Sequence, residues 1–95
     1  MAPVFFHTPR ISTIRRSVSN LSLGGVRIYS DQRLYVGERL DLEFFLPDGV
    51  TVKAKTKVVW IKEMPPETEA VYDVGMEFVG LSEGAAEKLK AVLKY

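Results

Sequence analysis

Apolar and polar residues alternate one by one along most of the chain, which is the spacing of a β-strand with one buried face. The alternation is clearest in residues 39–46 and in residues 50–62. Pro47-Asp48-Gly49 separates these segments, and proline and glycine favour a tight turn there. We therefore expect a β-hairpin. Its second strand would place on one face Val50, Val52, Ala54, Thr56, Val58 and Trp60.

Four further segments complete the predicted sheet. Residues 72–78 alternate clearly, residues 17–21 and 26–29 are short candidates, and residues 3–6 would open the sheet. The spacing becomes helical only at the C-terminus, where Ser82 is a suitable N-cap. The predicted fold is mainly β: a six-stranded antiparallel β-barrel with one C-terminal α-helix. The apolar face of that helix would consist of Ala85, Leu89, Val92 and Leu93.

Composition indicates one globular domain over residues 1–95, without disulfides. Cysteine is absent, so neither a disulfide framework nor a cysteine-based zinc site can form. The longest apolar runs, such as Val58-Val59-Trp60-Ile61, fall far short of the roughly 20 residues that cross a bilayer. No signal peptide is evident, so we expect a cytoplasmic protein without a membrane partner.

The charge balance disfavours nucleic-acid polymers as partners. A general polyanion binder carries a large basic excess, whereas this chain has a net charge of only +1. Arginines are nevertheless concentrated before the first acidic residue, Asp31. This local density suits a small anionic ligand, and the arginines concerned are Arg10, Arg15, Arg16 and Arg27.

The residues for catalysis or metal binding are missing from the sequence. His7 is the only histidine, and no nucleophile motif lies near it. No phosphate-binding loop is present, and no glycine-rich dinucleotide motif opens a helix. We therefore expect neither catalytic residues nor a metal, and no enzymatic activity.

The most informative segment is Asn20-Leu21-Ser22-Leu23-Gly24-Gly25, between two predicted strands and shortly after two adjacent arginines. Taken alone, it is an ordinary turn. Asn20 and Ser22 would bond to nearby backbone groups, and Gly25 would supply a left-handed residue.

With its surroundings, this segment resembles the Asp/Asn-x-Ser-x-x-Gly motif of the PilZ domain, a bacterial receptor module for cyclic di-GMP. Similar strands follow at residues 37–42, 58–61 and 72–78. The resemblance implies a barrel with a C-terminal helix, no cofactor and no catalysis. It also implies that Asn20 and Ser22 face a guanine edge, while Gly25 keeps the backbone clear of the ligand.

The sequence departs from the family at its arginines. PilZ domains present an Arg-x-x-x-Arg pair on an N-terminal loop, and no such spacing occurs in this chain. Either the chain is a piece that lacks this loop, or it is a degenerate member. In the second case we expect Arg10, Arg15 or Arg16 to act as partial substitutes that contact the charges of the ligand.

Two functions are therefore considered. The first is a cyclic di-GMP-binding signalling module that changes its contacts with a partner protein or adjacent domain. The second is a ligand-independent adaptor in motility or pilus assembly. The adaptor would use exposed apolar residues, and the candidates are Phe5, Phe6, Phe45 and Ile61. Alternatively, Phe45 and Ile61 pack against the helix. Single-stranded nucleic-acid binding is disfavoured by the near-neutral charge.

Overall fold

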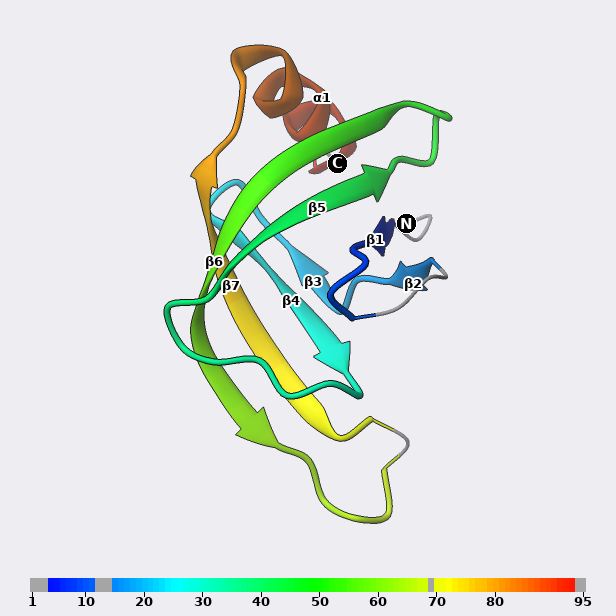
Figure 1. Ribbon diagram of the computed structural model, residues 1–95. Coiled ribbons are helices and arrows are strands. Elements are labelled where there is room, and N and C mark those ends of the chain that lie inside the picture. Colours follow the sequence, from blue (N-terminus) through cyan, green and yellow to red (C-terminus); the bar gives the residue numbers. More distant parts are fainter. Residues whose placement is uncertain (1–3, 12–14, 69, 94–95) are drawn as a thin grey trace.

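A computed structural model describes residues 4–11, 15–68 and 70–93, and these residues form seven strands and one helix (Figure 1). Pro3, at the start of the first predicted strand, lies outside the described residues. In chain order the elements are β1 (Phe5–His7), β2 (Arg16–Ser17), β3 (Asn20–Leu21), β4 (Gly25–Ser30), β5 (Arg39–Phe45), β6 (Thr51–Glu63), β7 (Tyr72–Gly80) and α1 (Glu83–Leu93).

All strand pairs are antiparallel, and the sheet order is β2-β1-β5-β6-β7-β4-β3. The two ends of this order, β2 and β3, are neighbours in the chain. The Val18 N–H donates to the Val4 carbonyl, whereas the Ser19 N–H donates to the Arg27 carbonyl, both at 2.9 Å. The sheet therefore curls into a half-barrel, with residues 16–21 shared between its two ends (Figure 1).

The predicted barrel had six strands, and the difference lies at residues 17–21. This segment was predicted as one strand, but it changes partner between Val18 and Ser19 and so divides into β2 and β3. The prediction of a mainly β fold with one C-terminal helix is confirmed.

The β5–β6 hairpin is confirmed, with Phe45 opposite Thr51 at the turn. Gly49 has a φ of 88°, a conformation that side chains disfavour, and the Asp48 carboxylate accepts a hydrogen bond from the Val50 N–H at 3.0 Å. The inward faces of the two strands supply much of the core: Leu40, Leu42, Phe44, Val52, Ala54, Thr56 and Val58.

The predicted position of Trp60 on that inward face is wrong. The register between β6 and β7 shifts after Val58, which lies opposite Met76, so that Trp60 lies opposite Gly75. This β-bulge inserts Val59 as an extra residue and reverses the alternation beyond it. Val58 is fully buried, whereas Val59 and Trp60 are both 41% exposed.

The helix α1 lies across one end of the curled sheet (Figure 1). Its N-terminus is capped as predicted, because the Ser82 hydroxyl accepts a hydrogen bond from the Ala85 N–H at 3.1 Å. Ala85 and Leu89 are buried against the core, and Val92 packs beside them. Within the part of the chain that the structure describes, no helix is long and apolar enough to cross a membrane.

The apolar residues considered for an adaptor surface differ in exposure. Phe6 is buried, and Ile61 packs against the core. Phe45 is half-buried, and the Arg15 guanidinium lies 3.6 Å from the centroid of its ring. Of the four residues, only Phe5 is exposed, at 40%.

Candidate functional site

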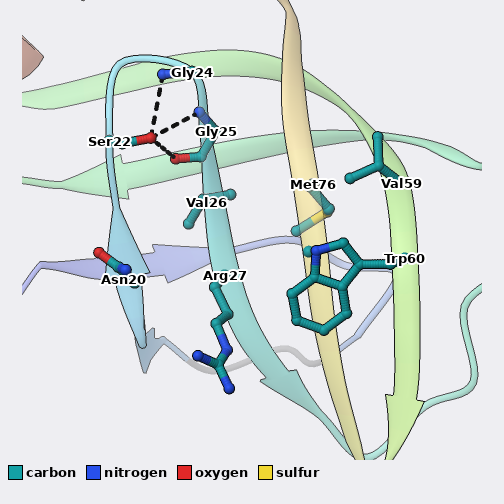
Figure 2. Close-up of a pocket in the computed structure, with 10 residues that line it drawn as sticks. Asn20, Ser22, Gly24, Gly25, Val26, Arg27, Val59, Trp60 and Met76 are labelled. Carbon is teal, nitrogen blue, oxygen red and sulfur yellow. Dashed lines mark hydrogen bonds between the residues drawn. The ribbon is translucent and has the colours of Figure 1, made fainter.

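The Asn20–Gly25 motif forms the tight connection between β3 and β4. Asn20 lies opposite Arg27, and Leu21 lies opposite Val26. The Ser22 hydroxyl oxygen accepts hydrogen bonds from the backbone N–H groups of Gly24 and Gly25, at 3.3 and 3.2 Å (Figure 2). The prediction that Ser22 satisfies local backbone donors is therefore confirmed. Among the described residues, the Asn20 side chain has no hydrogen-bond partner, so the prediction that it bonds to nearby backbone groups is wrong.

The predicted left-handed conformation of Gly25 is wrong. Among the described residues, positive φ angles occur only at Gly37 and Gly49. Gly25 is instead the first residue of β4 and lies opposite Glu77 in β7. A Cβ atom at Gly25 would overlap the carbonyl oxygen of Met76 and lie 3.1 Å from the Glu77 Cα. The motif requires glycine here because the backbones of β4 and β7 approach closely.

A pocket of about 350 Å³, which we name the turn pocket, lies beside this connection on the outer face of the sheet. It extends from the motif across β4 and β7 to the bulge in β6 (Figure 2). The residues that line it are Asn20, Ser22, Gly24, Gly25, Val26, Arg27, Val59, Trp60, Gly75 and Met76. The structure thus brings all three predicted motif residues to a single pocket.

Trp60 forms one wall of the turn pocket. Its indole ring lies against the backbone of Gly75, where a Cβ atom would overlap the ring atoms Nε1 and Cε2. The bulge at Val59 turns the ring outward, and Gly75 provides the flat surface on which it lies. An exposed aromatic ring beside a polar turn offers a stacking surface to a planar ligand.

Arg27 of β4 also lines the turn pocket and is held by Asp73 of β7. Its Nε donates to Asp73 Oδ1 at 2.9 Å, and its Nη2 donates to Oδ2. The Arg27 side chain is 46% exposed, whereas that of Asp73 is only 5% exposed. The hydrogen bonds to Asp73, and then its charge, raise the pKa of Arg27 above its ordinary value. Arginine is charged in proteins even without such a shift.

The orientation of Arg27 leaves part of its guanidinium for a ligand. The described residues give its Nη1 no hydrogen-bond partner. The Arg27 Cζ also lies 5.8 Å from the centroid of the Trp60 ring, within the range of a cation–π contact. A fixed cation and an aromatic face are therefore presented together.

The other three candidate arginines, Arg10, Arg15 and Arg16, lie outside the turn pocket and contact protein groups. Arg10 Nε donates to Glu38 Oε2 at 2.7 Å, and Arg16 Nη2 donates to Asp31 Oδ2 at 2.9 Å. Arg15 lies over Phe45, as described above. Their proposed role as substitutes for the arginine loop stays a prediction.

Sequence reasoning did not assign Trp60 or Asp73 to the site, and it named Arg27 only as one of four clustered arginines that suit a small anionic ligand. Alternation was a sufficient signal for Arg27, because it lies two residues after Gly25 and so on the same face of β4. No local signal indicated Trp60 or Asp73. Among the described residues, no three potential metal ligands come together.

A family model, described as the PilZ domain, matches residues 2–95. Neither the curated proteins nor the solved structures gave a significant match. The family match covers nearly the whole chain, including the motif turn, all of the described strands and the helix. The chain belongs to the PilZ domain family.

Proposed function

We propose that this chain binds cyclic di-GMP at the turn pocket and acts as a bacterial signalling module. The observation that carries the proposal is the arrangement of the Asn20–Gly25 motif, the Arg27 guanidinium and the Trp60 ring around one pocket. Membership of a family of binding modules, typically receptors for this dinucleotide, supports the same conclusion.

The side chains of the turn pocket match the chemistry of a guanine nucleotide. Guanine offers two acceptors, O6 and N7, to a planar arginine fork, and its ring can stack on an indole. Arg27 and Trp60 supply these two groups. The exposed Asn20 amide adds both a donor and an acceptor for the edge of the base.

Binding at this place would involve β3 and β4, which are neighbours in the chain, and β6, which is distant from them in sequence. The ligand would contact β3 and β4 through the motif, and β6 through Trp60. A ligand seated there would change the shape and charge of the outer face. We propose that a partner protein or a neighbouring domain responds to this change.

Calorimetric titration with cyclic di-GMP tests the proposal. We expect Trp60→Ala and Arg27→Ala each to weaken binding by roughly 5- to 150-fold, because each removes about 1–3 kcal/mol of stacking or base recognition. Tyr35→Ala and Arg39→Ala are the matched controls, since both residues are exposed and lie outside the turn pocket. Equal affinities for all four variants would refute the proposal.

The ligand-independent adaptor is the second candidate. It is favoured by one observation: Arg10, Arg15 and Arg16, the arginines expected to contact the ligand, each lie against a protein group. A chain that is fully folded by circular dichroism and yet shows no heat of binding would support the adaptor. Micromolar or tighter binding would exclude it.

A further inference from the structure

The curled sheet is open along one seam. β3 pairs with the outer edge of β4 only as far as Arg27, which lies opposite Asn20. The preceding strand, β2, pairs instead with β1, where Ser17 lies opposite Phe5. β2 and β4 therefore separate from each other, and a second pocket, of about 840 Å³, lies between them. We name it the seam pocket, and its lining includes Arg16, Ser17, Tyr29, Asp31, Met64 and Thr68.

The seam pocket adjoins the turn pocket on the outer face of β4. Arg27 lines the turn pocket, and Tyr29 lines the seam pocket. The two residues are two positions apart on one strand, so their side chains leave the same face about 7 Å from each other. Tyr29 is also near enough to contribute to the raised pKa of Arg27.

The two pockets present the same combination of groups. In the turn pocket an arginine bonded to an aspartate lies beside an exposed aromatic ring, that of Trp60. In the seam pocket Arg16 bonds to Asp31, and the exposed aromatic ring is that of Tyr29.

Arg16 is held less firmly than Arg27, which makes three hydrogen bonds to its aspartate through two nitrogens. A single 2.9 Å hydrogen bond joins Arg16 Nη2 to Asp31 Oδ2. The Nε of Arg16 is buried without a partner among the described residues. A buried donor without a partner is costly, so the Arg16 guanidinium gains by reorienting toward a ligand acceptor.

The pairing of Arg16 with Asp31 indicates a base rather than a phosphate as the ligand group. A carboxylate repels a phosphate, but it accepts hydrogen bonds from the N–H groups on the Watson–Crick edge of guanine. An arginine donates to O6 and N7 of the same base. Adenine has an amino donor in place of O6, so it cannot satisfy the arginine in the same way.

We propose that the seam pocket binds the second guanine of a cyclic dinucleotide whose first guanine occupies the turn pocket. Arg16 and Asp31 recognise the edges of this base, and Tyr29 packs against its face. The proposal rests on the function proposed above and adds a second site of base recognition to it. Arg16 would then recognise a base, whereas the sequence analysis expects it to contact the charged phosphates of the ligand.

The test is calorimetric titration with two ligands: cyclic di-GMP, and the cyclic dinucleotide with one guanine and one adenine. We expect the unaltered chain to prefer cyclic di-GMP by roughly 5- to 150-fold, the range for one well-recognised base. Arg16→Ala and Asp31→Asn should remove this preference, and Tyr29→Ala should weaken both ligands. Trp60→Ala should weaken both ligands while preserving the preference. Arg39→Ala, which also removes one exposed arginine, is the control.

The outcomes separate the second subsite from the function on which it rests. If the unaltered chain binds no cyclic di-GMP, both proposals are overturned. If it binds, but Arg16→Ala and Asp31→Asn behave like Arg39→Ala, only the second subsite is overturned. Arg16→Lys retains the charge without the planar fork, so full binding by this variant would also overturn guanine recognition. Thermal melting of each variant shows whether a loss of binding reflects a loss of folding, and Asp31→Asn, which keeps its shape, remains decisive if Arg16→Ala unfolds.

Discussion

Gly25→Ala adds a single methyl group where the backbones of β4 and β7 leave no room for a Cβ atom. The new Cβ atom would lie well inside 3.0 Å of the Met76 carbonyl oxygen, a distance that real Cβ atoms essentially never show. Because the obstructing atom belongs to the backbone, no side-chain rotation relieves the overlap. The two strands must separate at the register pair Gly25 and Glu77.

The expected loss in the free energy of unfolding has two contributions. Forcing an extra methyl group into a packed site costs about 1–3 kcal/mol. Separation also strains the hydrogen bond from the Phe78 N–H to the Gly24 carbonyl, now 3.0 Å, which contributes about 0.5–1.5 kcal/mol. We expect a loss of about 2–4 kcal/mol in the free energy of unfolding. For a domain of this size, the melting temperature would fall by roughly 10–30 °C.

Urea unfolding followed by circular dichroism measures this loss, and the adjacent Gly24→Ala provides a matched control. At Gly24 a Cβ atom would meet nothing nearer than the Ser22 hydroxyl oxygen, at 3.9 Å. Gly24→Ala should therefore leave stability unchanged, or raise it by less than about 1 kcal/mol through the unfolded chain. If the two variants unfold at the same urea concentration, the close approach of β4 and β7 does not explain the glycine of the motif.

Three further predictions concern the core, the helix and the positioning of Arg27. Thr56→Val removes the 2.9 Å hydrogen bond from a fully buried hydroxyl to the Leu40 carbonyl, and should lower the free energy of unfolding by about 1 kcal/mol in urea titration. Leu89→Ala should cost about 2–5 kcal/mol in the same assay, and an unchanged midpoint would mean that α1 adds nothing to the core. Asp73→Asn should weaken cyclic di-GMP binding in calorimetry by releasing Arg27. Combined with Arg27→Ala it should add no further loss, and additive losses would contradict a positioning role.

Most of the fold could be predicted because its strands follow local alternation. The hairpin of β5 and β6, the strand β7 and the capped helix all lie where residue spacing placed them. The division between β2 and β3 could not be predicted in this way. Nothing in the local sequence of residues 17–21 indicates a break in the strand. The break arises because the Val18 N–H bonds to the segment before β1, whereas the Ser19 N–H bonds to β4.

The candidate site was predicted only where its geometry depends on residues close together in the sequence. Ser22 bonds within its own turn, so its local role follows from sequence neighbours alone. Trp60 faces outward because Gly75, on another strand, accepts the indole ring beside a β-bulge. Asp73 lies 46 residues from Arg27, and only the register between β4 and β7 brings the two together. This register cannot be read from the local pattern of apolar and polar residues.

This long separation has a consequence for folding kinetics. The β3–β4 turn and the β6–β7 hairpin each form between neighbours in the chain, but the turn pocket exists only after β4 has joined β7. Such non-local pairing is the slow kind of step in β-sheet folding. A ligand that contacts both hairpins would therefore bind only the completed sheet, and by mass action it would oppose the separation of these strands. Slower unfolding in the presence of ligand would then report that the bound ligand resists the separation of β4 from β7.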